Sequence, residues 1–216
     1  MAHVAPRSMD EMPGLAPVFE GAEAAMGFVP NSMLTMAHMP QLPVAFSMLA
    51  NVVFGGDLQP LMKRLASVVP AQTDPQQSLP PELVQLIAYA TSVSSGCRYC
   101  QAHTSHSAHR LGAGQDKLDD LLNFETSTHY SEAEKAVVAL ALAAGAVPNE
   151  SNSDHFAALR EHFTDRQIVQ IVGVIAMFGF LNRWNDTMAT QLEPAPSEFA
   201  AQALGALGWQ LGKHQG

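Results

Sequence analysis

The chain has 216 residues, 47% of them hydrophobic, which is enough to bury a core and excludes an intrinsically disordered protein. Its 11 basic and 20 acidic residues give a formal charge of -9, which disfavours nucleic acids and anionic membranes as partners. The N-terminus lacks the apolar stretch of a signal peptide, and the longest apolar run, 171–181, is about half the ~20 residues of a membrane span. We therefore expect a cytoplasmic protein, where a cycling or metal-bound cysteine pair is favoured over a permanent disulfide.

Apolar residues recur at helical spacing between Pro and Gly, and no strand pattern stands out, so the sequence predicts an all-α fold. A polar stretch rich in Gln, Pro and Ser interrupts the apolar pattern and is the best candidate for a boundary. We interpret residues 1–70 as an N-terminal helical region, 71–80 as a linker and 81–216 as the functional core. In the first region, helices are predicted at 17–26, from residue 30 onward, at 43–54 and at 58–69.

In the core, one predicted helix stands out because it is apolar nearly all round, and we expect it to be central and buried. It begins at Ile168 and extends to about Leu181. Ser131 and Glu134 form a capping-box pattern that predicts the start of another helix. The other core helices are predicted at 81–95, 97–111, 117–122, 153–162 and 196–209.

The core also contains an internal similarity. Residues 83–87 resemble residues 168–172, and the same offset of 85 residues aligns Cys97-Arg98-Tyr99-Cys100 with Asn182-Arg183-Trp184-Asn185. Two interpretations are open. Buried helices can simply resemble one another, or the core contains a pseudo-duplicated helical hairpin in which only the first copy has cysteines.

The two cysteines of the chain are three residues apart, at Cys97 and Cys100. At a helix N-terminus, unpaired N–H groups and the helix dipole favour a thiolate, and a second cysteine one turn further on can close a disulfide. His103 shares a helix face with Cys100 and can accept a thiol proton. His106 is a further candidate, whereas His109 is interpreted as an exposed helix residue.

Two interpretations without redox chemistry are also open. The cysteines can be a buried apolar pair, or they can bind a structural zinc ion together with His103 and His106. A continuous helix would separate residues 97 and 106 by about two and a half turns, too far to close one tetrahedron. We therefore expect no metal.

The residues around the cysteine pair resemble the alkylhydroperoxidase D-like branch of the carboxymuconolactone decarboxylase superfamily. The likeness covers residues 80–112, and residues 163–186 look like the second half of longer family members. The resemblance implies an all-α homo-oligomer that reduces hydroperoxides without metal or flavin. It also implies that Cys100 attacks the peroxide, that Cys97 resolves the product as a disulfide, and that a thioredoxin-like or lipoyl-type dithiol restores both thiols.

The chain departs from the family pattern at two positions. Gln85 stands where the family has a relay Glu, and an amide cannot take a proton at neutral pH. We therefore expect Glu82, one turn earlier, to be the distal relay member, the alternative being a solvent-facing Glu in a first helical turn. Thr104 stands where the family has a His, which leaves His103 as the candidate.

The leading hypothesis is thus a peroxidase-like oxidoreductase that uses Cys97 and Cys100. The alternative is a non-catalytic α-helical oligomer that binds a small ligand or a partner protein on the same scaffold. A decarboxylase of the carboxymuconolactone type is a third hypothesis, which rests on kinship alone. The Met-rich stretch 26–48 is a predicted oligomer interface, because Met adapts to irregular contacts.

Overall fold

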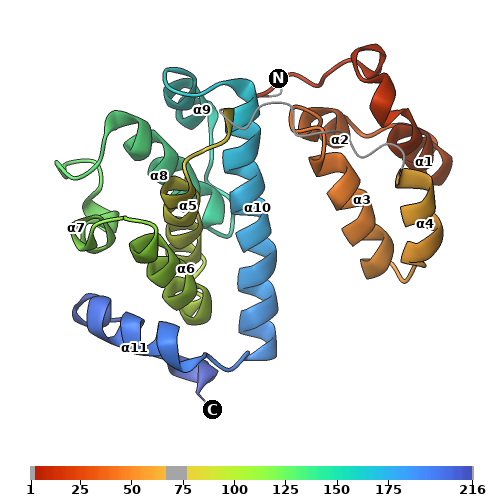
Figure 1. Cartoon of the computed structure of the whole chain (residues 1–216). Coiled ribbons are helices and arrows are strands. Elements are labelled where there is room, and N and C mark those ends of the chain that lie inside the picture. Colours follow the sequence, from red (N-terminus) through yellow and green to blue (C-terminus); the bar gives the residue numbers. More distant parts are fainter. Residues whose placement is uncertain (1–2, 67–76, 216) are drawn as a thin grey trace. The chain divides into compact units, whose positions relative to one another are not determined.

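The computed structural model describes residues 3–66 and 77–215 (Figure 1). Its regular elements are α-helices and 3₁₀ turns, and the described residues contain no strand, so the expected all-α fold is confirmed. The chain divides into two compact units: residues 1–78 with 165–169, and residues 79–164 with 170–216. The linker predicted at 71–80 lies mostly outside the described residues.

The first unit is a small helical assembly with its own apolar core. Pro occupies the first turn of three of its helices, where the missing N–H has no intrahelical partner to lose. The core side chains are Met12, Leu15, Val18, Phe19, Met33, Ala37, Val44 and Leu65. The helices are α1 (Ala16–Met26), α2 (Asn31–Met36), α3 (Leu42–Val53) and α4 (Leu58–Leu65), after two 3₁₀ turns at Met9–Glu11 and Pro13–Leu15.

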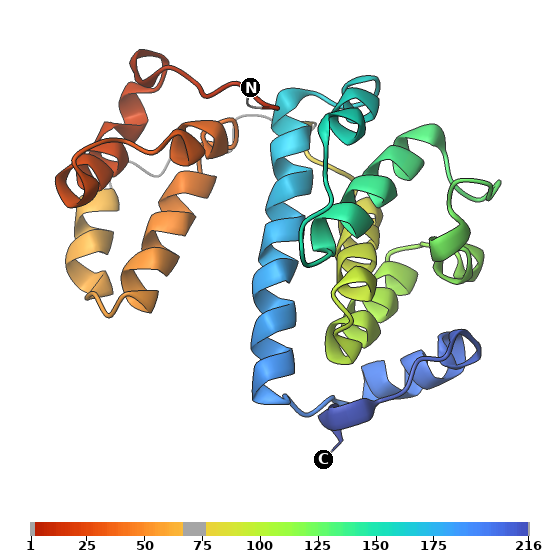
Figure 2. The same ribbon diagram turned by 180° about the vertical axis from the view of Figure 1, so that it is seen from behind.

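The second unit contains the cysteine pair. In it α5 packs against α6 and α8, α6 packs against α11, and α8 packs against α9. Both ribbon views show α11 running away from the C-terminal end of the long helix α10, on the side of α6 (Figures 1 and 2). The elements are α5 (Pro81–Ser94), α6 (Arg98–Arg110), α7 (Gln115–Asp119), α8 (Glu132–Gly145), α9 (Ser153–Arg160), α10 (Asp165–Met188) and α11 (Pro194–Ala203), with 3₁₀ turns at Leu121–Asn123, Gly205–Leu207 and Gly212–His214.

The α5–α6 hairpin positions the cysteines. The buried hydroxyls of Thr91 and Ser92 donate to carbonyls one turn back in α5, so the last turns of this helix can be buried without unsatisfied side-chain donors. Gly96 follows with a φ of +76°, a left-handed conformation that suits glycine. The chain then turns back into α6, and Cys97 becomes its N-cap residue.

The helix α10 differs from its prediction. One face is buried through residues such as Ile171, Ile175 and Asn185, but the opposite face is apolar and exposed. The expectation of a helix buried on all sides is therefore wrong, because apolar composition does not require that every face has a partner within one chain. The exposed side chains are Val172, Met177, Phe180, Trp184 and Met188.

By length and composition α10 could also cross a membrane. It has 24 residues, and its most apolar 18-residue window has a mean hydropathy of 1.2 with 28% of the window buried. This segment is longer than the apolar run at 171–181, because the helix continues through polar residues at both ends. It also continues without a break through residues 182–185, so the hairpin of α5 and α6 has no second copy here.

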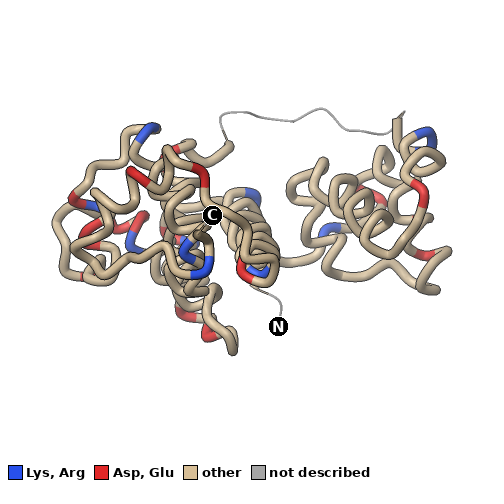
Figure 3. The backbone as a smooth tube through the Cα atoms, turned by 90° about the horizontal axis from the view of Figure 1, so that it is seen from below, with Lys and Arg blue, Asp and Glu red and all other residues tan. Residues whose placement is uncertain are grey.

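The helix ends show where local sequence rules succeed. The capping box of Ser131 and Glu134 is present at the start of α8, as predicted. A second capping box, of Asn152 and His155, begins α9 and was not foreseen. The last helix stops at Ala203 instead of continuing to residue 209. Charged residues are sparse along the backbone, and several are adjacent, such as Lys63-Arg64 and Asp119-Asp120, with long uncharged stretches between them (Figure 3).

Candidate active site

The two cysteines lie at the N-terminal end of α6 as free, buried thiols. Cys97 is 1% exposed and Cys100 is 2% exposed. Cys97 has extended backbone angles and its carbonyl accepts from the N–H of Gln101, which starts the helix. The side chain of Cys97 makes no capping hydrogen bond, but the backbone N–H groups of Tyr99 and Cys100, which a helix N-terminus leaves without intrahelical partners, help to lower its pKa.

The interaction between the two thiols separates their acidities. It is the main reason that the pKa of Cys97 is lowered, even though burial opposes the shift. The same interaction, with burial, raises the pKa of Cys100. The side-chain amide of Asn185 donates to the Cys100 sulfur at 3.5 Å and partly offsets that rise. Of the two sulfurs, Cys97 is the one prepared to carry a negative charge.

The candidate base His103 is engaged with a carboxylate. Its Nε2 lies 2.7 Å from Oε2 of Glu193, next to the start of α11, and the Tyr99 hydroxyl donates to the other oxygen at 3.1 Å. Burial of Glu193 favours its neutral form, but hydrogen bonds from its own N–H, from His103 and from Tyr99 leave the pKa of this carboxyl below its ordinary value. Burial, then the bond to Glu193, raises the pKa of Tyr99 to about 12.

The other predicted site residues lie elsewhere. Glu82 is an exposed residue in the first turn of α5, and ~18 Å of helix axis separates it from the turn that presents the cysteines. Gln85 follows one turn later and is half-buried. The ring of His106 contacts Phe199 of α11 at 5.1 Å, and burial is the main reason that its pKa is lowered. The structure therefore does not bring these three residues to the cysteine pair.

A second histidine, His214, reaches the cysteines from the C-terminal segment. Its Nδ1 lies 2.8 Å from the carbonyl oxygen of Thr190, and its ring is 1% exposed. Nε2 lies 3.5 Å from Oδ1 of Asp186, whose other oxygen accepts from Lys213 at 2.7 Å. A ring nitrogen of His214, the Cys97 sulfur and a carboxylate oxygen of Asp186 all lie within 4.8 Å of one another. Within the described ranges, these are the side chains that could be considered as metal ligands.

The C-terminal segment is anchored directly on the cysteine turn. The indole N–H of Trp209 donates to the carbonyl of Arg98 at 3.1 Å. The Arg98 guanidinium donates to Gln101, and the Gln101 amide donates to the carbonyl of Ser92 in α5. These bonds join α5, α6 and the C-terminal segment around one turn of backbone.

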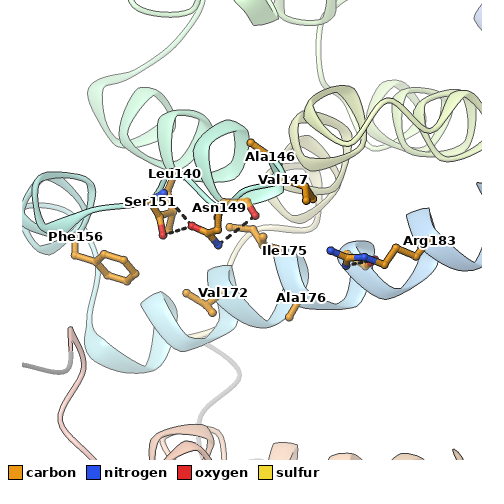
Figure 4. Close-up of a pocket in the computed structure, with 12 residues that line it drawn as sticks. Leu140, Ala146, Val147, Asn149, Ser151, Phe156, Val172, Ile175, Ala176 and Arg183 are labelled. Carbon is orange, nitrogen blue, oxygen red and sulfur yellow. Dashed lines mark hydrogen bonds between the residues drawn. The ribbon is translucent and has the colours of Figure 1, made fainter.

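One cavity of about 410 Å³ borders this turn. Residues on either side of Cys97 line it together with Trp209 and a group of leucines, so it is an apolar space with the Arg98 guanidinium at its wall. A second cavity, of about 470 Å³, lies between α8, the loop that follows it and α10, with Phe156 at one end and Arg183 at the other (Figure 4). Neither cysteine lines this second space.

Comparison with known proteins places this arrangement in a family. Residues 56–143 match the model of the carboxymuconolactone decarboxylase family. The apo structure of the debrominase Bmp8 is 34% identical to this chain, with 93% of this chain and 97% of that chain covered and a TM-score of 0.56. The chain belongs to the carboxymuconolactone decarboxylase superfamily, as the resemblance implied.

Two further superfamily structures match the chain. A cysteine-to-alanine variant of Bmp8 in complex with 2,3,4-tribromopyrrole is 32% identical over 94% of this chain and 98% of that one, with a TM-score of 0.55. An alkylhydroperoxidase AhpD core, a peroxidase-related protein from Ralstonia eutropha JMP134, is 26% identical over 78% of this chain and 80% of that one, with a TM-score of 0.46. No curated relative matches. The matched names are those of enzymes, which supports the expectation of an enzyme.

Several residues at the site have no local sequence signal. Asp186, Glu193 and His214 come from a helix end, a loop and a 3₁₀ turn, and nothing in their sequence surroundings marks them as partners of a cysteine pair. Asn185 is different, because the internal offset aligned it with Cys100, the sulfur to which it donates. That alignment was the one available signal for a neighbour distant in sequence.

Proposed function

We propose that this protein is a dithiol-dependent reductase in which Cys97 and Cys100 give two electrons to a small electrophile and become a disulfide. The observation that carries the proposal is a pair of free, buried thiols three residues apart at a helix N-terminus. One helical turn separates the two cysteines, and the helix N-terminus favours a thiolate on the first of them. The other thiol is then in place to close the disulfide.

A hydroperoxide is the substrate class that we favour. A thiolate attacks the outer peroxide oxygen, the O–O bond breaks, and the leaving alkoxide takes a proton to become an alcohol, which leaves a sulfenic acid on the protein. The second thiol displaces water from that sulfenic acid and the disulfide forms. An external dithiol, thioredoxin-like or lipoyl-type, returns both cysteines to thiols. Burial of both sulfurs favours small substrates over bulky ones.

Reductive debromination is the second candidate, because the debrominase Bmp8 resembles this chain across nearly its whole length. The reaction balances with the same dithiol: an aryl bromide and two thiols give the arene, a disulfide and hydrogen bromide. Carbon takes a proton in place of bromine, and the two electrons come from the sulfurs. A halogenated pyrrole, the ligand class of the Bmp8 complex, is the compound to try first.

We predict that one equivalent of hydroperoxide converts the reduced protein to the disulfide form. Thiol titration should fall from two free thiols to none, and the intact mass should fall by two hydrogens, since these are the two cysteines of the chain. A Cys97→Ser/Cys100→Ser double variant is the control. Two free thiols and an unchanged mass, after both hydroperoxide and brominated pyrrole, would contradict the proposed function.

The single variants assign the attacking thiol. The position of Cys97 at the N-terminus of α6 and its lowered pKa favour Cys97, whereas the resemblance assigns attack to Cys100. We expect Cys100→Ser to retain one stoichiometric turnover and stop as a sulfenic acid, and Cys97→Ser to lose that burst. The opposite pattern would give the two cysteines the roles that the family resemblance implies.

A further inference from the structure

The histidine of the C-terminal segment is held in one tautomer. Nδ1 of His214 lies 2.8 Å from a backbone carbonyl, which can only accept, so Nδ1 carries the hydrogen. In the neutral ring Nε2 then has a free lone pair. The carbonyl of His214 accepts from the N–H of Leu192, which also fixes the turn that presents the ring. The ring is therefore buried in a set orientation.

The free nitrogen has no hydrogen-bond partner. Nε2 of His214 is buried and unsatisfied, and its 3.5 Å separation from Asp186 lacks hydrogen-bond geometry. A buried lone pair without a donor is costly unless the site supplies a proton at some stage of its work. The nearest thiol is that of Cys97, in the same cluster of atoms within 4.8 Å. Catalytic hydrogen bonds are often long in a free enzyme and shorten with substrate.

We propose that His214 is the proton acceptor for Cys97, a role that rests on the use of this thiol in the proposed function. The Cys97 proton moves to Nε2, and the resulting imidazolium lies beside the Asp186 carboxylate. When the thiolate has broken the O–O bond of a hydroperoxide, the same proton passes from Nε2 to the departing alkoxide. His214 is then neutral again, and Cys100 closes the disulfide with loss of water.

The charged and titratable groups around the ring agree with this role. The Asp186 carboxylate of α10 opposes a thiolate on Cys97 but favours an imidazolium on His214. The Lys213 ammonium donates to the other carboxylate oxygen of Asp186. The ring of Tyr99 in α6 lies 5.7 Å from the ring of His214, measured between centroids. Of these groups, only the Asp186 carboxylate places negative charge beside Nε2, and it shares that charge with the Lys213 ammonium.

The test is the titration of the Cys97 thiolate in the full-length reduced protein without substrate. His214→Asn keeps an amide N–H where Nδ1 was and removes Nε2, and His109→Asn is the matched control on exposed α6 surface. Thiolate ultraviolet absorbance, assigned by difference from Cys97→Ser, should show a midpoint raised by about one pH unit or more in His214→Asn, which is about a tenfold loss of thiolate at neutral pH. The control should titrate like the natural protein.

An unchanged midpoint in a folded His214→Asn protein would overturn the inference, as would one equivalent of zinc in the purified natural protein. If the variant does not fold, ring nitrogen NMR of the natural protein decides. A neutral ring protonated at Nδ1, with shifts that respond to blocking of Cys97, supports the role, and a ring protonated at Nε2 refutes it. Because neither measurement involves turnover, failure of this inference is distinguishable from failure of the proposed function.

Discussion

The carboxylate that reaches His103 comes from Glu193, 90 residues away in the sequence. It lies between the imidazole and the Tyr99 hydroxyl, so one side chain couples two polar groups of α6. Glu82 was the predicted carboxylate, but it is exposed in the first turn of α5. At the scale of single residues, the polar partners of the groups near the cysteines thus come from the C-terminal part of the chain.

We predict that Glu193→Gln slows hydroperoxide reduction, whereas Glu82→Gln leaves the rate and its pH profile unchanged. Glu193 holds His103 and Tyr99 of α6 next to the cysteine turn, so its loss should disturb the site, whereas Glu82 lies ~18 Å of helix axis away from that turn. The pKa of Glu193 is already lowered, so its carboxylate is charged at neutral pH and its contribution should disappear only as pH falls through that low value. Steady-state rates across pH compare the two variants, and an equal loss in both would restore Glu82 to the relay.

At the scale of elements, the start of α6 could be predicted and its partners could not. The Gly96 break and a polar run after it locate a helix N-terminus near the cysteines, because backbone sterics and capping are local effects. The likeness of the two apolar segments leaves two interpretations open, and the structure excludes the second hairpin, because α10 has no glycine break after residue 181 and continues as one helix. Whether an apolar helix is covered on every side is decided by tertiary contacts, which its own sequence does not contain.

The capping box of α8 provides a stability prediction. Ser131→Ala removes the oxygen that accepts from the N–H of Glu134, and should lower the free energy of unfolding by about 1 kcal/mol. Ser8, an N-cap residue without a side-chain cap bond, is the control, and Ser8→Ala should change stability by less than about 0.5 kcal/mol. Denaturant unfolding followed by circular dichroism measures both, and equal losses would show that the cap contributes nothing.

The same box should make α8 sensitive to acid. Burial raises the pKa of Glu134, but hydrogen bonds from Lys117 and Ser131 outweigh it, and the net pKa is lowered. A lowered folded pKa means that the contribution to stability is present above the unfolded value and is lost as pH falls through the folded one. The difference between the natural protein and Glu134→Gln should therefore shrink when the unfolding measurement is repeated in acid.

At the scale of the whole molecule, the exposed apolar face of α10 needs a partner. From Met177 to Met188 its large side chains recur every three or four residues along the helix, and Phe180 and Trp184 stack with ring centroids 6.1 Å apart. Contiguous apolar surface of this kind marks an association site. In the first unit Met33 is buried in the core while Met26 is 56% exposed, so the Met-rich stretch is divided between core and surface.

We predict a homo-oligomer in which a second copy covers this face of α10. Light scattering should give a mass above the 23.1 kDa of one chain. Trp184→Glu should weaken association by about tenfold or more, since burying a large apolar side chain is worth about 1.5–3 kcal/mol. Thr187→Glu, at an exposed polar position on the same helix, is the control. A particle of single-chain mass at micromolar concentration would end this prediction.

The two tryptophans of the chain lie in contrasting surroundings, so the intrinsic fluorescence of the protein can report on two different events. Trp209 is 7% exposed and its indole is bonded to the cysteine turn, whereas Trp184 is 55% exposed on α10. We expect the fluorescence of Trp209 to depend on the oxidation state of the sulfurs and on whether the segment that holds His214 is docked. The fluorescence of Trp184 should depend on whether its face of α10 is in water. Single Trp→Phe variants therefore separate redox events from association events in one fluorescence experiment, with no added dye.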